Sequence, residues 1–257
     1  MRTVSLPDEG WIAQVGPVDG IRLLAWGLDD EPPEPAPGLV VPPLGSPQRF
    51  ARLREVPGLR VVQLVTAGYD HALPHLPDGV TLCNAPGVHD AATAELAVAV
   101  VLASLRGIPE FVRAQGEGRW VPLRMWPTLA ERRVLVIGYG RIGRAVAERL
   151  APFGARITAV AASPRPGDGT VERVHGVDGL PTLLPHHDVV ILLTPLVEAT
   201  RGLVDATFLA ALPDGALVVN IARGPVVDTA ALLAECASGR LRAAIDVHDE
   251  ERSEEHT

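Results

Sequence analysis

Residues Val134–Gly143 read VLVIGYGRIG, an apolar strand followed at once by three glycines in the spacing GxGxxG. A helix is predicted directly after them, over Ile142–Leu150. In this setting the first glycine permits a tight turn, the second lets a pyrophosphate approach the backbone, and the third lets the helix pack closely on the strand. The start of the helix would then offer unpaired N–H groups to the phosphates. The stretch predicts a Rossmann-type domain that binds a dinucleotide; the alternative is a merely glycine-rich turn.

The chain around that stretch alternates apolar strands with helices. Alternation of this kind indicates βαβ units and a parallel sheet. We predict strands over Arg133–Ile137, Arg156–Ala161, Asp188–Leu193, Ala216–Asn220 and Ala243–Val247, and further helices over Ala206–Leu212 and Thr229–Ser238. The predicted fold class is therefore α/β, with a doubly wound parallel sheet.

The first part of the chain has the same character on a smaller scale. Ile21–Trp26, Leu59–Thr66 and Val80–Asn84 are predicted strands, and the proline-rich residues 30–47 are a predicted loop. These short elements suit a small α/β domain.

The longest predicted helix lies between the two regions. Asp90–Arg106 is apolar almost all round, which predicts that it is buried. Gly107 and Pro109 are expected to end it, and Trp120–Pro127 is a predicted loop.

The composition and the charge argue against several classes of protein. The 257 residues are enough for one large domain or two modest ones. A formal net charge of -8 gives no reason to expect nucleic acid as a partner and would repel an anionic membrane surface. No apolar run reaches the ~18 residues of a membrane span, no signal peptide is evident, and Cys83 and Cys236 fit neither a disulfide framework nor a metal motif. A cytoplasmic protein without a metal site is expected.

The end of the second Rossmann strand bears on the choice of coenzyme. A carboxylate at this position usually holds the adenosine ribose 2′-OH of NAD. Here the residues are Ala161-Ala162-Ser163-Pro164-Arg165, without an acid. Ser163 and Arg165 could instead hold a 2′-phosphate, with arginine as a bidentate partner. The sequence therefore favours NADP over NAD; the alternative is that Arg165 is a solvated loop residue.

Six motifs occur in one order along the chain. They are Val65–Asp70 (VTAGYD), Gly79–Asn84 together with Thr93–Leu96, the GYGRIG loop, Thr194–Leu196 together with Thr200–Gly202, Asn220–Asp228 (NIARGPVVD), and Asp246-Val247 followed by Glu251. In these motifs the chain resembles the D-2-hydroxyacid dehydrogenase family, over about Val61–Glu251. The resemblance implies a flavodoxin-like substrate domain at residues 1–88 and an NAD(P)-binding Rossmann domain at residues 89–251.

The resemblance also implies roles for individual residues. Arg223 would bind the substrate carboxylate and keto oxygen with its planar fork of donors, and would polarise the carbonyl during hydride transfer. The backbone of Ala67 and Gly68 would bind the substrate carboxylate. Residues that would hold the cofactor or line its site are Gly138, Tyr139, Gly140, Arg141, Ile142, Gly143, Thr194, Pro195, Ala222 and Asp246. Taken singly, Arg223 has a plainer interpretation as a surface arginine, Gly68 as a turn glycine, and Thr194 and Pro195 as part of a loop.

The catalytic histidine of the family has no counterpart in this sequence. In the family a histidine is the general acid and base, and a glutamate paired with it raises its pKa. Glu251 matches that glutamate, although it also lies in a charged stretch. None of the eight histidines matches the family's PH motif, which lies well beyond the glutamate. We therefore expect the 257-residue chain to turn over negligibly.

The last six residues, RSEEHT at 252–257, depart from the family. They are also what a widely used sequencing adapter encodes in this reading frame. We interpret them as non-native and expect the natural chain to continue through the histidine; a charged natural C-terminus is the alternative. A chain cut here would bind cofactor weakly and expose apolar surface.

The predicted function is hydride transfer between NADP, or NAD, and a small 2-keto or D-2-hydroxy acid such as glyoxylate or hydroxypyruvate. The resemblance implies a homodimer when the protein is full length, through the helix Asp90–Arg106. Two alternatives remain. One is a 3-phosphoglycerate dehydrogenase, which would want extra cations near Ala67–Asp70. The other is a non-catalytic NAD(P)-sensing binding protein on the same fold.

Overall fold

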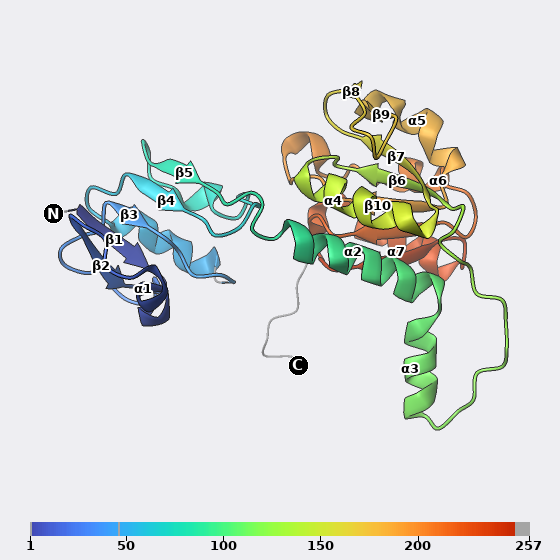
Figure 1. The fold of residues 1–257 in the computed structure, drawn as a ribbon, viewed down its shortest axis with the longest axis horizontal. Coiled ribbons are helices and arrows are strands. Elements are labelled where there is room, and N and C mark those ends of the chain that lie inside the picture. The colour runs from blue at the N-terminus through green and yellow to red at the C-terminus, as the bar shows by residue number, and fades with distance from the viewer. Residues whose placement is uncertain (1, 46, 250–257) are drawn as a thin grey trace. The chain divides into compact units, whose positions relative to one another are not determined.

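The structure is a computed structural model that describes residues 2–45 and 47–249 (Figure 1). The chain divides between His89 and Asp90 into two compact units. Each unit is built on one sheet, and the strand pairs are parallel with a single exception. The predicted α/β class, with a Rossmann-type sheet and a smaller flavodoxin-like sheet, is confirmed.

The first unit holds a five-stranded sheet in the order β2-β1-β3-β4-β5. This is the flavodoxin-like order. The strands are β1 (Arg2–Leu6), β2 (Ile21–Ala25), β3 (Leu39–Val40), β4 (Val61–Gln63) and β5 (Thr81–Cys83), and the helical segments are α1 (Glu9–Val15) and the 3-10 helices η1 (Pro47–Glu55) and η2 (Leu73–His75). Trp26, Phe50 and Leu53 are buried in its core with residues of β3 and β4.

The first unit differs from the sequence-based prediction in several places. Residues 30–47, predicted as a loop, contain β3, which pairs with β1 on one side and β4 on the other. A strand of two residues has no detectable period, so only its pairing defines it. β1 and α1 lie where the sequence predicts no element. Asp8 caps α1 by accepting a hydrogen bond from the Trp11 N–H at 3.0 Å.

The second unit holds a seven-stranded sheet in the order β12-β11-β10-β6-β7-β9-β8, in which only β8 and β9 pair antiparallel. The strands are β6 (Arg133–Ile137), β7 (Arg156–Val160), β8 (Arg165–Pro166), β9 (Arg173–His175), β10 (Val189–Leu192), β11 (Leu217–Asn220) and β12 (Arg242–Ile245). The chain leaves β6 toward β7 and later returns to β10 on the other side of β6. The topological switch point, where ligands bind in open α/β sheets, therefore lies between β6 and β10.

Helical elements lie on both faces of this sheet. They are α2 (Asp90–Leu105), α3 (Ile108–Gly116), α4 (Arg141–Leu150), α5 (Leu180–Leu183), α6 (Ala206–Ala210) and α7 (Thr229–Ala237), with 3-10 helices η3 (Ala151–Phe153), η4 (Val177–Gly179), η5 (Leu184–His186), η6 (Glu198–Thr200) and η7 (Gly224–Val226). Successive residues of β6 face opposite cores. Val134 and Val136 pack with α2 and α4, whereas Leu135 and Ile137 pack with α5, α6 and α7. Burial on both faces explains why these strands are continuously apolar.

The prediction that the long helix is buried all round is correct for one face only. The buried residues of α2 are Ala94, Ala97, Val98, Val101 and Leu105, which belong to the core shared with α4. On the other face Leu96 is 39% exposed.

A further helix, α3, follows directly where the sequence predicts an end. Gly107 has a φ of +67° and turns the chain, and Pro109 lies in the first turn of α3, where a missing N–H leaves no bond unmade. In Figure 1, α3 and the segment after it extend away from the sheet of this unit. No single described helix is long and apolar enough to cross a membrane; α2 and α3 reach that length together but are bent by 68°.

Candidate functional site

The residues that the sequence predicts for the cofactor site follow the carboxyl ends of neighbouring strands. Because β12, β11, β10, β6 and β7 are parallel, these ends share one edge of the sheet. Along that edge the order is Asp246, Arg223, Thr194, Gly138 and Ser163. The structure thus brings together, from five strands, residues that are far apart in the sequence.

The three glycines of the GYGRIG loop meet different surroundings. Gly138 has a φ of +102°, and a Cβ there would lie 2.5 Å from the Leu193 carbonyl carbon. A Cβ on Gly143 would collide with the Gly138 carbonyl oxygen, whereas a Cβ on Gly140 would point into open space. Two glycines are therefore required by packing, and the open side of Gly140 leaves room for a phosphate.

The backbone, not the side chains, of this loop faces the edge of the sheet. Tyr139 is buried, Arg141 forms an ion pair with Asp90 at 2.8 Å, and Ile142, in the first turn of α4, packs against the core. Gly140 is the N-cap of α4 and offers no side-chain acceptor to the N–H groups of the first turn. A helix start of this kind binds anions through those N–H groups.

Thr194 follows β10, beside Gly138. Its Oγ1 is buried and, among the residues that the structure describes, has no hydrogen-bond partner. The next residue is held firmly, since the Pro195 carbonyl accepts a hydrogen bond from the Thr200 hydroxyl at 2.6 Å. An orphaned hydroxyl next to the open side of the glycine loop fits a polar ligand that supplies the missing bond. A dinucleotide therefore fits the residues present.

The turn after β11 holds Arg223 in place. Asn220 is buried, and its side chain accepts a hydrogen bond from the Ala222 N–H and donates one to the Arg223 carbonyl, both at 3.0 Å. The Arg223 guanidinium donates to the Ala222 carbonyl at 2.7 Å. Gly224 closes the turn where a Cβ would collide with the backbone of His248. Asn220 is part of the NIARGPVVD motif, but the sequence alone predicts no role for it; its two side-chain hydrogen bonds fix the turn that carries Arg223.

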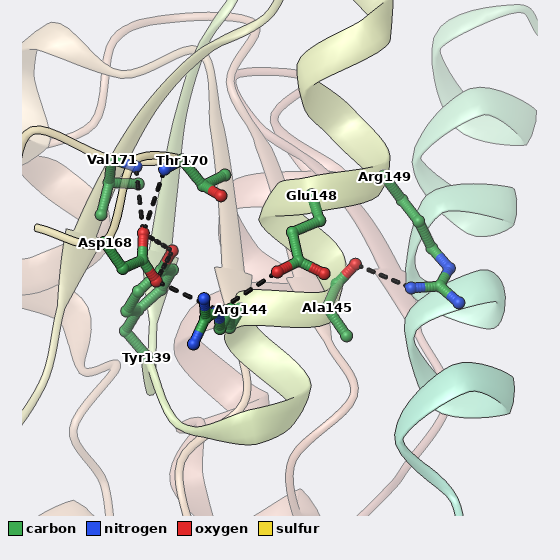
Figure 2. Close-up of polar contacts among 8 residues, drawn as sticks. All are labelled: Tyr139, Arg144, Ala145, Glu148, Arg149, Asp168, Thr170 and Val171. Atoms are coloured by element: carbon green, nitrogen blue, oxygen red, sulfur yellow. Dashed lines mark hydrogen bonds and ion pairs between the residues drawn. The ribbon is translucent and has the colours of Figure 1, made fainter.

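The residues after β7 approach the glycine loop from the other side. Ser163 and Arg165 are exposed, and the Arg165 guanidinium donates to the Tyr139 carbonyl and, at 3.5 Å, to the Ser163 carbonyl. Asp168, three residues later, forms a hydrogen bond with the Tyr139 side chain (Figure 2). The sequence-based prediction missed Asp168, because only tertiary structure brings it to Tyr139.

In the first unit, Ala67 and Gly68 lie in the turn after β4. Their carbonyls accept hydrogen bonds from the Asn84 amide and the Thr66 hydroxyl, both at 2.8 Å. Their N–H groups donate to no acceptor within residues 2–45 and 47–249. The turn therefore presents two free backbone donors.

The remaining predicted site residues lie near the end of the described chain. Asp246 is exposed, and its N–H donates to the Asn220 carbonyl at 3.0 Å. Glu251 lies outside the described residues.

His187, the most buried of the described histidines, lies at the wrong edge for a cofactor site. Its Nδ1 is 2.7 Å from the Leu183 carbonyl and its Nε2 is 2.8 Å from the Thr158 hydroxyl. It precedes β10, a strand about 13 Å long, whereas Thr194 follows that strand. His175 is the last residue of β9. Within the described ranges no cluster of three His, Cys, Asp or Glu side chains could hold a metal ion.

Comparisons with known proteins agree on one family. A family model described as D-isomer specific 2-hydroxyacid dehydrogenase, NAD binding domain, matches residues 98–257. The chain is 33% identical over 259 residues to glyoxylate reductase/hydroxypyruvate reductase of Mus musculus, covering 94% of this chain and 78% of the mouse protein.

Two solved structures extend the comparison. A D-isomer specific 2-hydroxyacid dehydrogenase from Xanthobacter autotrophicus Py2, in complex with NADPH and MES, is 33% identical with a TM-score of 0.76, covering 97% of this chain and 82% of that one. An NADPH-dependent glyoxylate/hydroxypyruvate reductase from Sinorhizobium meliloti, in complex with NADP and sulfate, is 26% identical with a TM-score of 0.80, covering 100% of this chain and 84% of that one.

Proposed function

This chain belongs to the D-isomer specific 2-hydroxyacid dehydrogenase family of NAD(P)-dependent oxidoreductases, and from that premise we propose that it transfers hydride between NADPH and a small 2-keto acid such as glyoxylate or hydroxypyruvate. One observation carries the proposal. The glycine loop after β6 and Arg223 after β11 share one edge of the sheet, with only β10 between them. Two strand spacings amount to about 10 Å, a span that a dinucleotide lying along this edge bridges.

Arg223 is the residue that we propose for substrate binding. Its backbone is fixed by Asn220, so its side chain leaves a defined turn. A guanidinium offers a planar fork that can take a carboxylate and polarise the neighbouring keto oxygen. The nicotinamide ring, when bound, supplies the hydride. The role of the protein is to bind the keto acid and to stabilise the negative charge that develops on its keto oxygen.

NADPH is the coenzyme that the residues after β7 favour. No carboxylate ends this strand, and Ser163 and Arg165 stand there instead. Arginine has five N–H donors. Arg165 donates to two carbonyls, those of Ser163 and Tyr139, which leaves other donors for a 2′-phosphate. The Xanthobacter structure is a complex with NADPH and the Sinorhizobium structure a complex with NADP, which supports the same choice.

Residues 1–88 are proposed as the substrate domain. The free N–H groups of Ala67 and Gly68 support this assignment, because two adjacent backbone donors suit a carboxylate. Residues 89–251 are proposed as the coenzyme domain.

Slow turnover of the 257-residue chain is part of the proposal. A general acid contributes about 10²–10⁴-fold to a rate. Among the described histidines, His187 lies at the opposite edge, and the His248 carbonyl lies beside Gly224 in the turn of Arg223. We expect a turnover at least about 100-fold below that of the Sinorhizobium enzyme assayed in parallel. A His248→Gln variant of this chain is expected to turn over at the same rate.

A homodimer is also proposed. The outer face of α2 and the segment beyond it carry exposed apolar residues, of which Trp120, Leu123 and Met125 are each at least 88% exposed. Several large apolar side chains exposed to water so close together in the chain are typical of an interaction surface.

The experiment that tests the function measures substrate binding and turnover separately. Calorimetry with NADPH and oxamate, an analogue of a 2-keto acid, is expected to show binding that Arg223→Gln abolishes. The control is Arg113→Gln, which changes an exposed arginine of α3. The slow oxidation of NADPH is then followed by its absorbance at 340 nm, and the rates with glyoxylate, hydroxypyruvate and phosphohydroxypyruvate are compared. NADPH binding without oxamate binding would favour the cofactor-sensing alternative, and preference for the phosphorylated acid would favour a phosphoglycerate dehydrogenase.

A further inference from the structure

A hydrogen bond joins the glycine loop to the β8–β9 hairpin. Tyr139, the second residue of the loop, is 3% exposed. Its hydroxyl donates to the Asp168 carboxylate, whose two oxygens lie 3.2 and 3.1 Å away (Figure 2). Asp168 lies in the turn between β8 and β9, 29 residues further along the chain. The bond is therefore a tertiary contact between two parts of the coenzyme site.

The Asp168 carboxylate is held by several other groups (Figure 2). It accepts hydrogen bonds from the N–H groups of Thr170 at 3.1 Å and Val171 at 3.4 Å, and it lies 3.4 Å from Nε of Arg144. Arg144 in turn pairs with Glu148 at 3.1 Å. The turn therefore has bonds of its own that do not involve the Tyr139 hydroxyl.

The charges of the pair fix which group donates. Burial raises the pKa of Tyr139 to about 12, and the hydrogen bond and charge of Asp168 add to the effect. Burial alone would raise the pKa of Asp168, but the N–H groups of Thr170 and Val171, the Tyr139 hydroxyl and the Arg144 charge outweigh it and lower that pKa. A neutral phenol thus faces a charged carboxylate at neutral pH, and such charge-assisted bonds are stronger than neutral ones.

The hairpin also contacts the backbone of Tyr139. Arg165, the first residue of β8, donates from its guanidinium to the Tyr139 carbonyl, and its Cζ lies 6.0 Å from the ring centroid. Arg165 pairs with Val174 across the hairpin, and the Gly167 N–H donates to the Glu172 carbonyl at 3.2 Å. The hairpin therefore binds Tyr139 at two points: Arg165 donates to its carbonyl, and Asp168 accepts from its hydroxyl.

We propose that the Tyr139–Asp168 hydrogen bond is a latch that holds the β8–β9 hairpin on the glycine loop and so positions Arg165 for the 2′-phosphate of NADPH before the coenzyme arrives. The proposal rests on the proposed preference for NADPH. Ordering a long, exposed side chain in advance lowers the entropy that binding must otherwise lose. NADH has no 2′-phosphate, so it gains little from a placed Arg165. Tyr139 and Asp168 are thus positioning residues that affect one coenzyme more than the other.

The test removes a single oxygen atom. Tyr139→Phe keeps the buried ring and deletes the hydroxyl, and Tyr69→Phe, in the only other tyrosine, is the matched control. Hydrogen exchange of residues 166–172 without coenzyme is expected to speed up about 10-fold in Tyr139→Phe alone, since a bond to a charged group is lost. Fluorescence titration is expected to give a dissociation constant for NADPH raised about 5–10-fold and one for NADH changed less than about 2-fold.

The outcomes separate the latch from the function on which it rests. Unchanged exchange of the hairpin would overturn the latch, whatever the coenzymes do. Faster exchange with equal weakening of both coenzymes would overturn the positioning of Arg165. If the unsubstituted chain binds NADH but not NADPH, the proposed coenzyme fails and the role of the latch with it. Should Tyr139→Phe not fold, Asp168→Asn, which keeps the turn acceptor and loses the charge, is expected to show the same selective loss.

Discussion

Arg165 is the side chain on which the coenzyme preference depends most directly. In Arg165→Ala the 2′-phosphate loses a charge-assisted partner, so we expect the dissociation constant for NADPH to rise about 10–100-fold and that for NADH to change less than about 2-fold. Fluorescence titration with both coenzymes measures this. Arg173→Ala is the matched control, because Arg173 lies on the paired strand of the same hairpin and is also exposed. An equal effect on both coenzymes would contradict the preference for NADPH.

His187 ties the stability of the second unit to pH. Burial lowers its pKa, against the opposing effect of its bond to Leu183. The neutral ring can donate from Nδ1 to the Leu183 carbonyl and accept at Nε2 from the Thr158 hydroxyl. As pH falls below the unfolded pKa of about 6.5, the unfolded chain binds the proton first. The stabilisation is therefore complete above that pH and is lost as pH falls toward the folded pKa.

The measurement for His187 is the melting temperature between pH 7.5 and pH 5.5. We expect His187→Gln to lower Tm at pH 7.5 and to show a shallower fall toward pH 5.5 than the unsubstituted chain. Parallel curves for the two proteins would mean that other groups carry the pH dependence.

At the scale of the strand–loop–helix element, substitutions of two glycines of the GYGRIG loop are expected to impair different properties. One lowers stability and the other weakens coenzyme binding. Gly143→Ala places a Cβ against the Gly138 carbonyl oxygen. We therefore expect the free energy of unfolding to fall by about 2 kcal/mol and Tm to fall by about 5 °C. Gly140→Ala meets nothing, so Tm is expected to stay within about 1 °C while the dissociation constant for NADPH rises at least about 10-fold. Thermal melts and titrations of both variants separate the two effects. A Gly140→Ala protein that binds NADPH normally would show that the phosphates lie elsewhere.

The elements that the sequence predicts well are those whose own residues carry the signal. β6 begins and ends at the predicted residues, and β7, β10 and β11 differ from prediction by one or two residues, because runs such as VLVI are buried on both faces. GYGRIG is likewise readable, since its three glycines follow β6 directly at a fixed spacing and a Cβ on Gly143 would collide with Gly138, five residues earlier. The strands and the glycine loop of the coenzyme site therefore follow from short stretches of sequence.

The elements that prediction misses depend on partners elsewhere in the chain. β8 has two residues, one of them a proline, and exists only through its pairing with β9. α3 starts at Ile108 and has in its first turn Pro109, which the sequence presents as a stop. Asp168 looks like any turn aspartate until Tyr139 reaches it from 29 residues away. No local pattern encodes such contacts, so the latch could not be predicted.

At the scale of the whole molecule, the exposed apolar segment beyond α3 predicts the state of association. Leu123→Glu combined with Met125→Glu places two charges on a surface that we propose to be buried between copies, which is expected to raise the dimer dissociation constant at least about 100-fold. Light scattering during gel filtration measures the mass over a range of concentrations. Leu233→Glu is the control, because that leucine is 63% exposed on α7. Identical masses for all three proteins would place the interface elsewhere.

The position of β6 at the centre of its sheet has a consequence for how the protein is made. Its neighbour β7 leaves the ribosome soon after it, but β10, the strand that covers its other edge, follows about 50 residues later. At about 5–20 residues per second, that edge stays open for roughly 3–10 s. An apolar strand with unpaired backbone groups can pair with other nascent chains during this interval. The yield of folded protein is therefore expected to depend on the speed of translation and on chaperones acting at the ribosome more than on the stability of the finished sheet.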